Sequence, residues 1–178
     1  MGSANKYFLS RLYQKYAIIF FVGIVALIII LFYIFYRQPW VEDHLFTPLV
    51  DFYARLSGSL LALLGFTNDV SADIIYSTAF SVSVKKGCDA AEPMAIFIAG
   101  IVAFPAMIRH KLFGLGTGLA ILFLLNIIRI VSLYITGIYY PGVFEAMHLA
   151  VWQVAFILVA VLLWFMWLHY VVKKAVTK

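Results

Sequence analysis

The sequence predicts an all-α polytopic membrane protein with about four transmembrane helices, an outer interfacial helix and a short β-like segment before its single cysteine. Two observations support this fold class. Hydrophobic residues make up 65% of the 178 residues and charged residues 12%, and the mean hydropathy is +1.03. Several apolar runs also reach about 20 residues, the length that crosses a bilayer. We therefore expect a single integral membrane domain over residues 1–178 rather than a soluble protein.

The first three elements have different patterns. Residues 16–36 form an apolar run behind basic residues and predict a retained transmembrane helix, because no small-residue cleavage pattern follows. Residues 44–66 have apolar positions at helical spacing but include charges, which predicts an interfacial or partly inserted helix. Residues 69–86 alternate like two short strands with a turn at Ser77-Thr78. We expect this last segment outside the bilayer core, where unpaired backbone groups meet water.

Three further transmembrane helices are predicted at 90–107, 112–134 and 145–170. The second of them begins with glycines at alternate positions, which suit close helix packing. These glycines are Gly114, Gly116 and Gly118.

The basic residues predict the orientation of the chain. With four spans, eight basic residues lie on the side of both termini and four on the other side, and the side richer in Lys and Arg is normally cytoplasmic. We therefore expect a multi-pass protein of the plasma (inner) membrane with cytoplasmic termini. A full span at 44–66 would reverse the later helices and remove this agreement. The eight are Lys6, Arg11, Lys15, Arg109, Lys111, Lys173, Lys174 and Lys178, and the four are Arg37, Arg55, Lys85 and Lys86.

Cys88 lies between the strand-like segment and the helix at 90–107. A helix N-terminus and nearby lysines, including Lys86, favour a thiolate, so we expect a lowered thiol pKa and a candidate nucleophile. The negative charges of Asp89 and Glu92 raise the thiol pKa, although their spacing also resembles an N-terminal capping arrangement. The alternative is that Cys88 is a small buried apolar residue, as free cysteines often are.

Arg129 is the most unusual residue, because it lies inside an apolar run. Ionisable residues inside membrane helices usually face a partner or a polar cavity, and Asn126 lies on the same helical face, where it can support the guanidinium or a substrate. The alternative is an arginine that reaches to the outer interface.

His148 opens the last helix at the same outer level as Cys88, and Glu145 precedes it by three residues, where it can orient the ring or cap the helix. His44 is the other histidine on that side, whereas His110 and His169 are expected on the inner side. A thiol, an imidazole and a guanidinium together suit acyl transfer, with the roles of nucleophile, proton carrier and oxyanion binder.

These residues resemble the exosortase and archaeosortase family, most closely its small exosortase H branch. The matching features are Gly87-Cys88, the Asn-x-x-Arg pattern from Asn126 to Arg129, and His148, over roughly residues 69–170. One departure is Asp89, where the family has a small residue. The resemblance implies a transpeptidase that cleaves the C-terminal sorting tail of secreted proteins through a thioester on Cys88 and transfers them to a cell-surface acceptor. Such a tail contains a short motif, a transmembrane helix and a basic cluster.

Two alternatives stay open. An intramembrane cysteine protease would only hydrolyse its substrate, and a non-catalytic membrane scaffold would use the helices alone. The motifs of serine, aspartyl and zinc proteases are absent from the sequence. We expect no metal, no cofactor and no nucleic acid partner, and contact with membrane lipid along the apolar helices.

Overall fold

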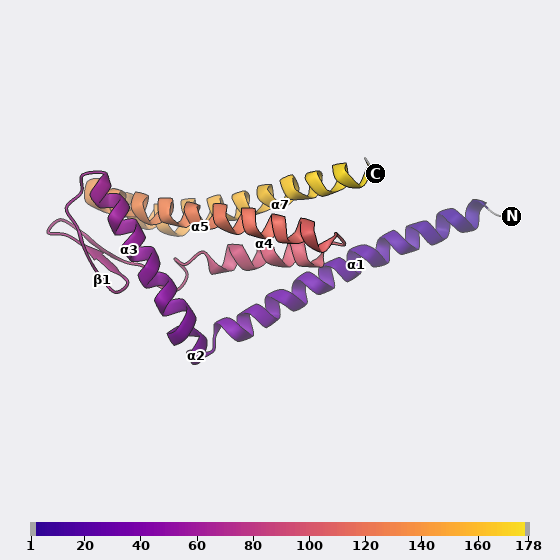
Figure 1. The fold of residues 1–178 in the computed structure, drawn as a ribbon, viewed down its shortest axis with the longest axis horizontal. Helices are drawn as coiled ribbons and strands as arrows, with labels where there is room; N and C mark the ends of the chain where they lie inside the picture. The colour runs from indigo at the N-terminus through magenta and orange to yellow at the C-terminus, as the bar shows by residue number, and fades with distance from the viewer. Residues whose placement is uncertain (1–2, 177–178) are drawn as a thin grey trace.

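The computed structural model describes the backbone of residues 3–176 and the side chains of residues 16–174. Long helices lie side by side, and a small sheet covers one end of them (Figure 1). The helices, including π-helical turns η1 and η3 and 3₁₀ turn η2, are α1 (Ser3–Tyr36), α2 (Pro39–Val41), η1 (Glu42–Phe46), α3 (Thr47–Leu63), α4 (Ala91–Ala103), α5 (Ile108–Tyr139), η2 (Pro141–Val143), α6 (Phe144–Ala146), η3 (Met147–Val151) and α7 (Trp152–Val176). The strands are β1 (Asp69–Ser71), β2 (Ile74–Tyr76) and β3 (Ser81–Ser83).

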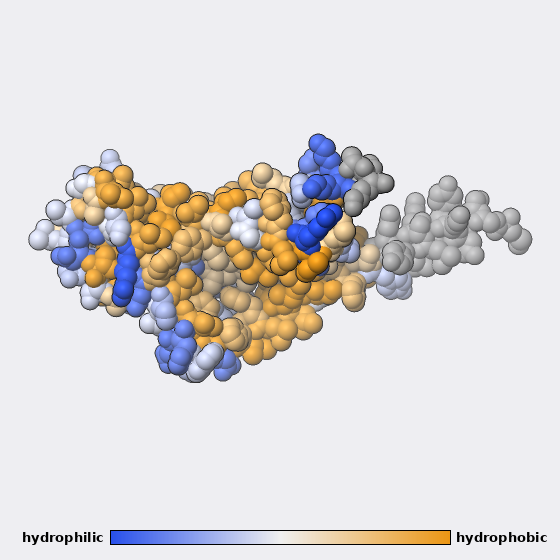
Figure 2. All heavy atoms as spheres, in the orientation of Figure 1, coloured by the Kyte–Doolittle hydropathy of each residue, from blue (hydrophilic) through white to orange (hydrophobic). Residues whose placement is uncertain are grey.

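The predicted all-α polytopic membrane fold is confirmed. Among the described residues, three helical segments are long and apolar enough to cross a membrane, at Tyr16–Tyr36, Ile108–Tyr139 and Pro141–Lys174. Orange apolar residues cover the middle of the molecule in Figure 2, and blue hydrophilic groups gather towards its ends. Such a belt is what a bilayer requires of the surface that it contacts. The side chains of Lys6, Arg11, Lys15 and Lys178, which enter the predicted orientation, lie outside the described residues.

Helix α4 is shorter than the predicted span 90–107. It ends at Ala103 because Pro105 follows, and Phe104 before this proline has an extended backbone with ψ 134°. Its 13 residues give a length of about 20 Å, against about 30 Å of bilayer core. Conversely, α5 extends beyond the predicted 112–134 at both ends, and it is longer than its neighbours α4 and α7.

Helix α3 lies obliquely across the end of α5 where the sheet also packs (Figure 1). Its buried face carries small and large side chains, among them Ala54 and Tyr53, whereas the large apolar residues Phe52 and Leu63 are exposed. Apolar residues on both faces are typical of a helix that contacts protein on one side and lipid on the other. This arrangement suits the partly inserted form of the predicted 44–66 helix.

The strand-like segment forms a three-stranded antiparallel sheet in the order β1-β2-β3. The predicted pair of strands corresponds to β2 and β3, and β1 is an additional strand that the alternation did not indicate. The turn between β2 and β3 is held by Ser77, whose Oγ accepts hydrogen bonds from the N–H groups of Ala79 and Phe80. Ile75 and Val84 are buried against α3 and α5, so the sheet is fixed on the helices.

Two apolar cores meet at the sheet end of the bundle. One joins α3, the sheet and α5, and the other joins α4, α5 and α7. Cys88 packs against the first core and its neighbour Ala90 belongs to the second. The loop that contains the cysteine is thus held between two rigid packing units.

Candidate active site

The loop around Cys88 has a defined backbone. Gly87 has φ +93° and Ala90 has φ +58°, and these left-handed residues turn the chain sharply on either side of the cysteine. The Cys88 N–H donates to the carbonyl of Lys85 at 2.8 Å. From α5, Asn126 Nδ2 donates to the Cys88 carbonyl at 2.9 Å. The predicted supporting residue Asn126 therefore positions the cysteine backbone, and not the guanidinium of Arg129.

Cys88 Sγ lies 3.0 Å from Nε2 of His148. His148 is in η3, the π-helical turn just before α7, and π-helical turns often mark functional sites because they displace side chains from the regular helical register. Phe144 lies beside the imidazole, with ring centroids 5.9 Å apart. The structure thus brings together two of the residues predicted from the sequence, at a distance that allows direct proton transfer.

Arg129 completes the predicted group of three. Its side chain is buried, with 4% exposure, and Nη2 lies 3.9 Å from Cys88 Sγ. The guanidinium carbon lies 5.6 Å from the ring centroid of Phe156 on α7. Arg129 Nε has no hydrogen-bond partner among the described residues. This burial differs from the alternative of an arginine that reaches to the interface, and it places the guanidinium beside the thiol through Nη2.

The pKa of the Cys88 thiol is raised, chiefly by burial. The positive charge of Arg129 acts in the opposite direction, whereas the negative charge of Asp89 raises the pKa further. A hydrogen bond to the Lys85 backbone lowers the pKa, but the net direction is upward, so the expectation of a lowered thiol pKa is wrong. Lys86 Nζ instead donates to the Tyr36 carbonyl at 2.8 Å and forms an ion pair with Glu42 at 3.0 Å.

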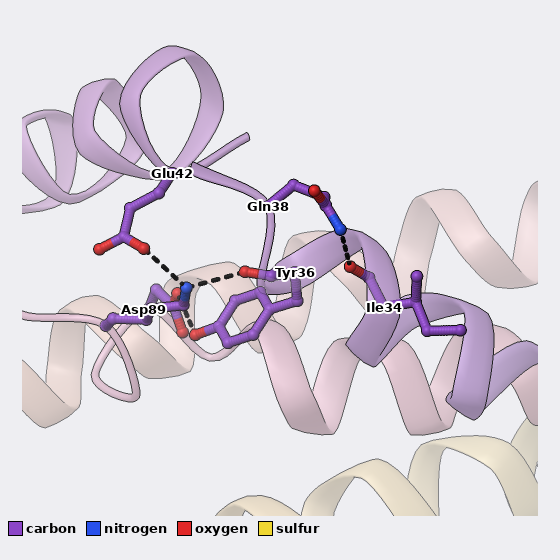
Figure 3. A network of polar contacts seen from close by, with 6 residues as sticks. Ile34, Tyr36, Gln38, Glu42 and Asp89 are labelled. Atoms are coloured by element: carbon purple, nitrogen blue, oxygen red, sulfur yellow. Dashed lines mark hydrogen bonds and ion pairs between the residues drawn. The ribbon is translucent and has the colours of Figure 1, made fainter. Parts of the chain in front are cut away.

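Asp89 is the site residue whose role the sequence left unexplained. It is 1% exposed, and Oδ2 accepts a hydrogen bond from the Tyr36 hydroxyl at 3.0 Å, as Figure 3 shows. Oδ1 accepts from the N–H of Ala91 at 3.1 Å, at the start of α4. Together with the Lys86 contacts, this carboxylate ties the end of α1 to the cysteine loop. Only its capping potential was visible in the sequence, since no local pattern identifies Tyr36 as its partner.

The other predicted residues take supporting or separate positions. Glu92 Oε1 accepts a hydrogen bond from the Tyr33 hydroxyl at 3.1 Å, which adds a second contact between α1 and α4. Glu145 is exposed and makes no hydrogen bond to His148 within the described part of the chain, so the structure does not support its role in orienting the ring. The His44 Nδ1 contacts the Trp40 carbonyl at 2.9 Å, and the ring stacks on Trp40 rather than joining Cys88.

The two histidines that the sequence predicts on the inner side also lie apart from the cysteine. His110 is buried near the start of α5, where its carbonyl accepts a hydrogen bond from Trp167 Nε1 at 2.8 Å. His169 is exposed near the end of α7. Both positions agree with the expectation that these two histidines do not reach the candidate site.

A cavity of about 310 Å³ opens onto the three candidate residues. Its wall is formed by β3 and its flanking residues on one side and by α5 and Phe144 on the other. The described residues include no group of three or more His, Cys, Asp or Glu placed to hold a metal ion. The arrangement provides a half-buried thiol, a contacting imidazole, a nearby cation and space for a chain segment.

Comparison with known protein families identifies a match. A family model described as transmembrane exosortase (Exosortase_EpsH) matches residues 17–165. This match extends the resemblance noted over residues 69–170 towards the N-terminus, into the first transmembrane helix. No curated protein and no solved structure matches the chain.

Proposed function

Because the chain belongs to the transmembrane exosortase family, whose members are membrane transpeptidases that sort proteins, we propose that Cys88 is the nucleophile of such an enzyme. The proposed substrates are secreted proteins with a C-terminal motif, a transmembrane helix and a basic tail. The observation that most supports this proposal is the 3.0 Å contact between Cys88 Sγ and His148 Nε2, with Arg129 at 3.9 Å. Placement in the small exosortase H branch stays a prediction.

The first step is attack by sulfur on the carbonyl carbon of the scissile peptide bond. The thiol proton passes to His148 Nε2 as the carbon–sulfur bond forms, and the carbonyl oxygen becomes an oxyanion. Burial raises the pKa of the Cys88 thiol and so favours its neutral form. A contacting base is then needed, because the neutral thiol is a poor nucleophile.

The second step is departure of the amine. Arg129 stabilises the oxyanion, since its guanidinium lies near the sulfur and lines the same cavity. As the carbon–nitrogen bond breaks, His148 gives its proton to the leaving amine, which takes the transmembrane tail with it. The N-terminal part of the substrate remains as a thioester on Cys88.

The third step transfers the protein. An acceptor nucleophile attacks the thioester carbonyl, loses its proton to His148 and releases the Cys88 thiol. We propose a cell-surface acceptor, and water in the same position would give simple hydrolysis. The proposed location is the plasma membrane, with cytoplasmic termini and the site at the outer, periplasmic face.

The test is to trap the thioester. Membranes that contain the protein are incubated with tagged candidate tails, quenched in acid and analysed by mass spectrometry. We expect an adduct on Cys88 with the mass of the N-terminal fragment, which neutral hydroxylamine releases. His169→Ala is the matched control and should form the same adduct, because His169 is exposed and lies apart from the site. Cleavage that proceeds with no adduct, or that persists in Cys88→Ala, would contradict the proposal.

A further inference from the structure

Strand β3 has an open edge. The sheet order is β1-β2-β3, and β3 pairs only with β2 among the described strands, in the register Ile74↔Ser83, Ile75↔Val82 and Tyr76↔Ser81. An edge strand presents unpaired backbone N–H and C=O groups, which can receive another strand. The outer edge of β3 is therefore available for a further extended segment.

The hydrogen bonds at the ends of this ladder show which residues face the open edge. The Phe80 carbonyl accepts from Ser77 N–H at 2.9 Å, and Val84 N–H donates to the Asp73 carbonyl at 2.8 Å. Backbone groups in an antiparallel pair alternate in direction from one residue to the next. Positions 80, 82 and 84 thus face β2, so the backbone groups of Ser81 and Ser83 point to the open edge.

The cavity at the candidate active site follows this same edge. It is lined by every residue from Phe80 to Val84, as well as by Cys88 and His148. Side chains of a strand alternate between faces, so contact with five consecutive residues places the cavity along the strand rather than over one face. The opposite wall includes the apolar side chains of Ile130 and Leu133.

We propose that the substrate motif binds as an additional strand at the open edge of β3, hydrogen-bonded to the backbone of Ser81 and Ser83. This inference rests on the proposed function. Strand addition gives affinity through the main chain and selects side chains through alternate pockets. At about 3.3 Å per residue, pairing with both serines fixes a substrate segment of about three residues. The segment then continues along the same cavity to Cys88, where its scissile carbonyl meets the sulfur.

The sharpest test uses the wild-type protein and the tail that forms the thioester. A series of synthetic tails is made, each with one backbone amide N-methylated across the motif. N-methylation removes a donor and blocks a strand edge, so we expect KM to rise about tenfold or more at alternate residues and to change by less than about twofold between them. A response without this two-residue alternation would overturn the proposal.

A variant pair tests the protein side. Ser81→Pro removes the N–H that faces the open edge, whereas Thr78→Pro places a proline in the exposed turn of the same hairpin, outside the cavity. We expect Ser81→Pro to raise KM about tenfold while Thr78→Pro stays near wild type, because only the donor at the open edge is used. The alkylation rate of Cys88 serves as the folding control. If Ser81→Pro changes that rate, the N-methylated tails and the wild-type protein test strand addition instead. Unchanged KM in a folded Ser81→Pro protein would contradict strand addition.

Failure of the underlying function gives a different result. If no candidate tail forms a thioester with the wild-type protein, the proposed function is wrong and strand addition falls with it. If thioester forms but the alternation is absent, only strand addition is wrong.

Discussion

Burial and charge at Cys88 decide how the thiol behaves before substrate arrives. The side chain packs against the core of α3, the sheet and α5, and burial raises the thiol pKa. In the proposed mechanism the close imidazole of His148 accepts the thiol proton as sulfur attacks. The raised pKa favours the protonated thiol, which is less readily oxidised than a thiolate.

Asp89→Asn should make the thiol more reactive at neutral pH. The Asp89 charge raises the Cys88 pKa, so its removal lowers that pKa and increases the thiolate fraction at every pH below it. We expect alkylation by iodoacetamide at pH 7.5 to accelerate about two- to fivefold, with the difference vanishing at high pH, where both thiols are ionised. The pH profile of the alkylation rate measures this change.

The charge-matched control is Asp69→Asn, because Asp69 is exposed on β1 and does not influence the Cys88 pKa. Tyr36→Phe separates charge from the hydrogen bond, since it keeps the Asp89 carboxylate but removes its hydroxyl donor. An Asp89→Asn profile shifted to higher pH would show that the assigned effect of this charge has the wrong sign.

Arg129→Lys should strongly reduce processing although the charge is kept. Lysine has a single ammonium centre and cannot reproduce the planar set of donors that faces the sulfur and an oxyanion. Loss of one oxyanion donor typically costs about 100-fold or more in kcat, and we expect a loss of that order. Processing rates normalised to folded protein measure it, and a loss below about threefold would remove Arg129 from the reaction.

For the individual site residues, the sequence predicted which side chains lie together but not all of their contacts. Cys88, Arg129 and His148 were identified because each is anomalous in an apolar chain and all lie at one level. Lys86 was misjudged, since it lies near the cysteine in sequence but is turned towards Glu42. The partner of Asp89 is Tyr36, 53 residues away, and only the folded chain shows such a contact.

Close helix packing depends on small residues of α5. On α5, Gly114 lies against Trp167 of α7 and Gly118 against Phe97 of α4, with no room for a Cβ atom at either position. Gly116, by contrast, has open space where its Cβ would lie. The sequence predicted a small-residue face at these glycines, and the structure limits it to two positions four residues apart.

Gly118→Ala should destabilise the protein, whereas Gly116→Ala should not. A methyl group at position 118 meets the buried ring of Phe97, and overpacking of this kind costs about 1–3 kcal/mol. At position 116 the same change gains about 0.5–1 kcal/mol of helix propensity. Thermal unfolding in detergent measures both, and equal midpoints for the two variants would contradict the packing of α5 on α4.

The π-helical turn at Met147–Val151 and the early end of α4 were not predicted from the sequence. Hydrophobic periodicity predicts a helix through 145–170, but it does not distinguish a π turn from an α turn. Pro105 was a visible stop signal for α4, and the apolar residues beyond it outweighed that signal in the predicted span.

At the scale of the whole molecule, helix α1 begins and α7 ends towards the same side, and the sheet lies on the other (Figure 1). This arrangement agrees with the predicted path of the chain, which rested on the long apolar runs and the positions of basic residues. Composition therefore predicted the class, whereas the predicted number of about four spans exceeds the three long apolar segments among the described residues, because α4 is short. The oblique course of α3 depends on tertiary packing and was left open between an interfacial and a partly inserted helix.

The predicted orientation is tested by labelling single cysteines in a Cys88→Ser background. Lys85→Cys lies in the loop before the site and Arg109→Cys lies at the start of α5, and both positions are exposed. We expect a membrane-impermeant maleimide to label position 85 in intact cells and position 109 only after permeabilisation. The reverse pattern would place the candidate site on the cytoplasmic side.

If Cys88 performs acyl transfer with His148 and Arg129, processing depends on its sulfur. The amount of processed tail per unit of folded membrane protein in Cys88→Ala measures this dependence. Removing one half-buried sulfur changes the packing little, so the variant should insert and accumulate like His169→Ala. We predict no detectable processing by Cys88→Ala and wild-type processing by His169→Ala. Full processing by well-folded Cys88→Ala would contradict the account and favour a non-catalytic scaffold.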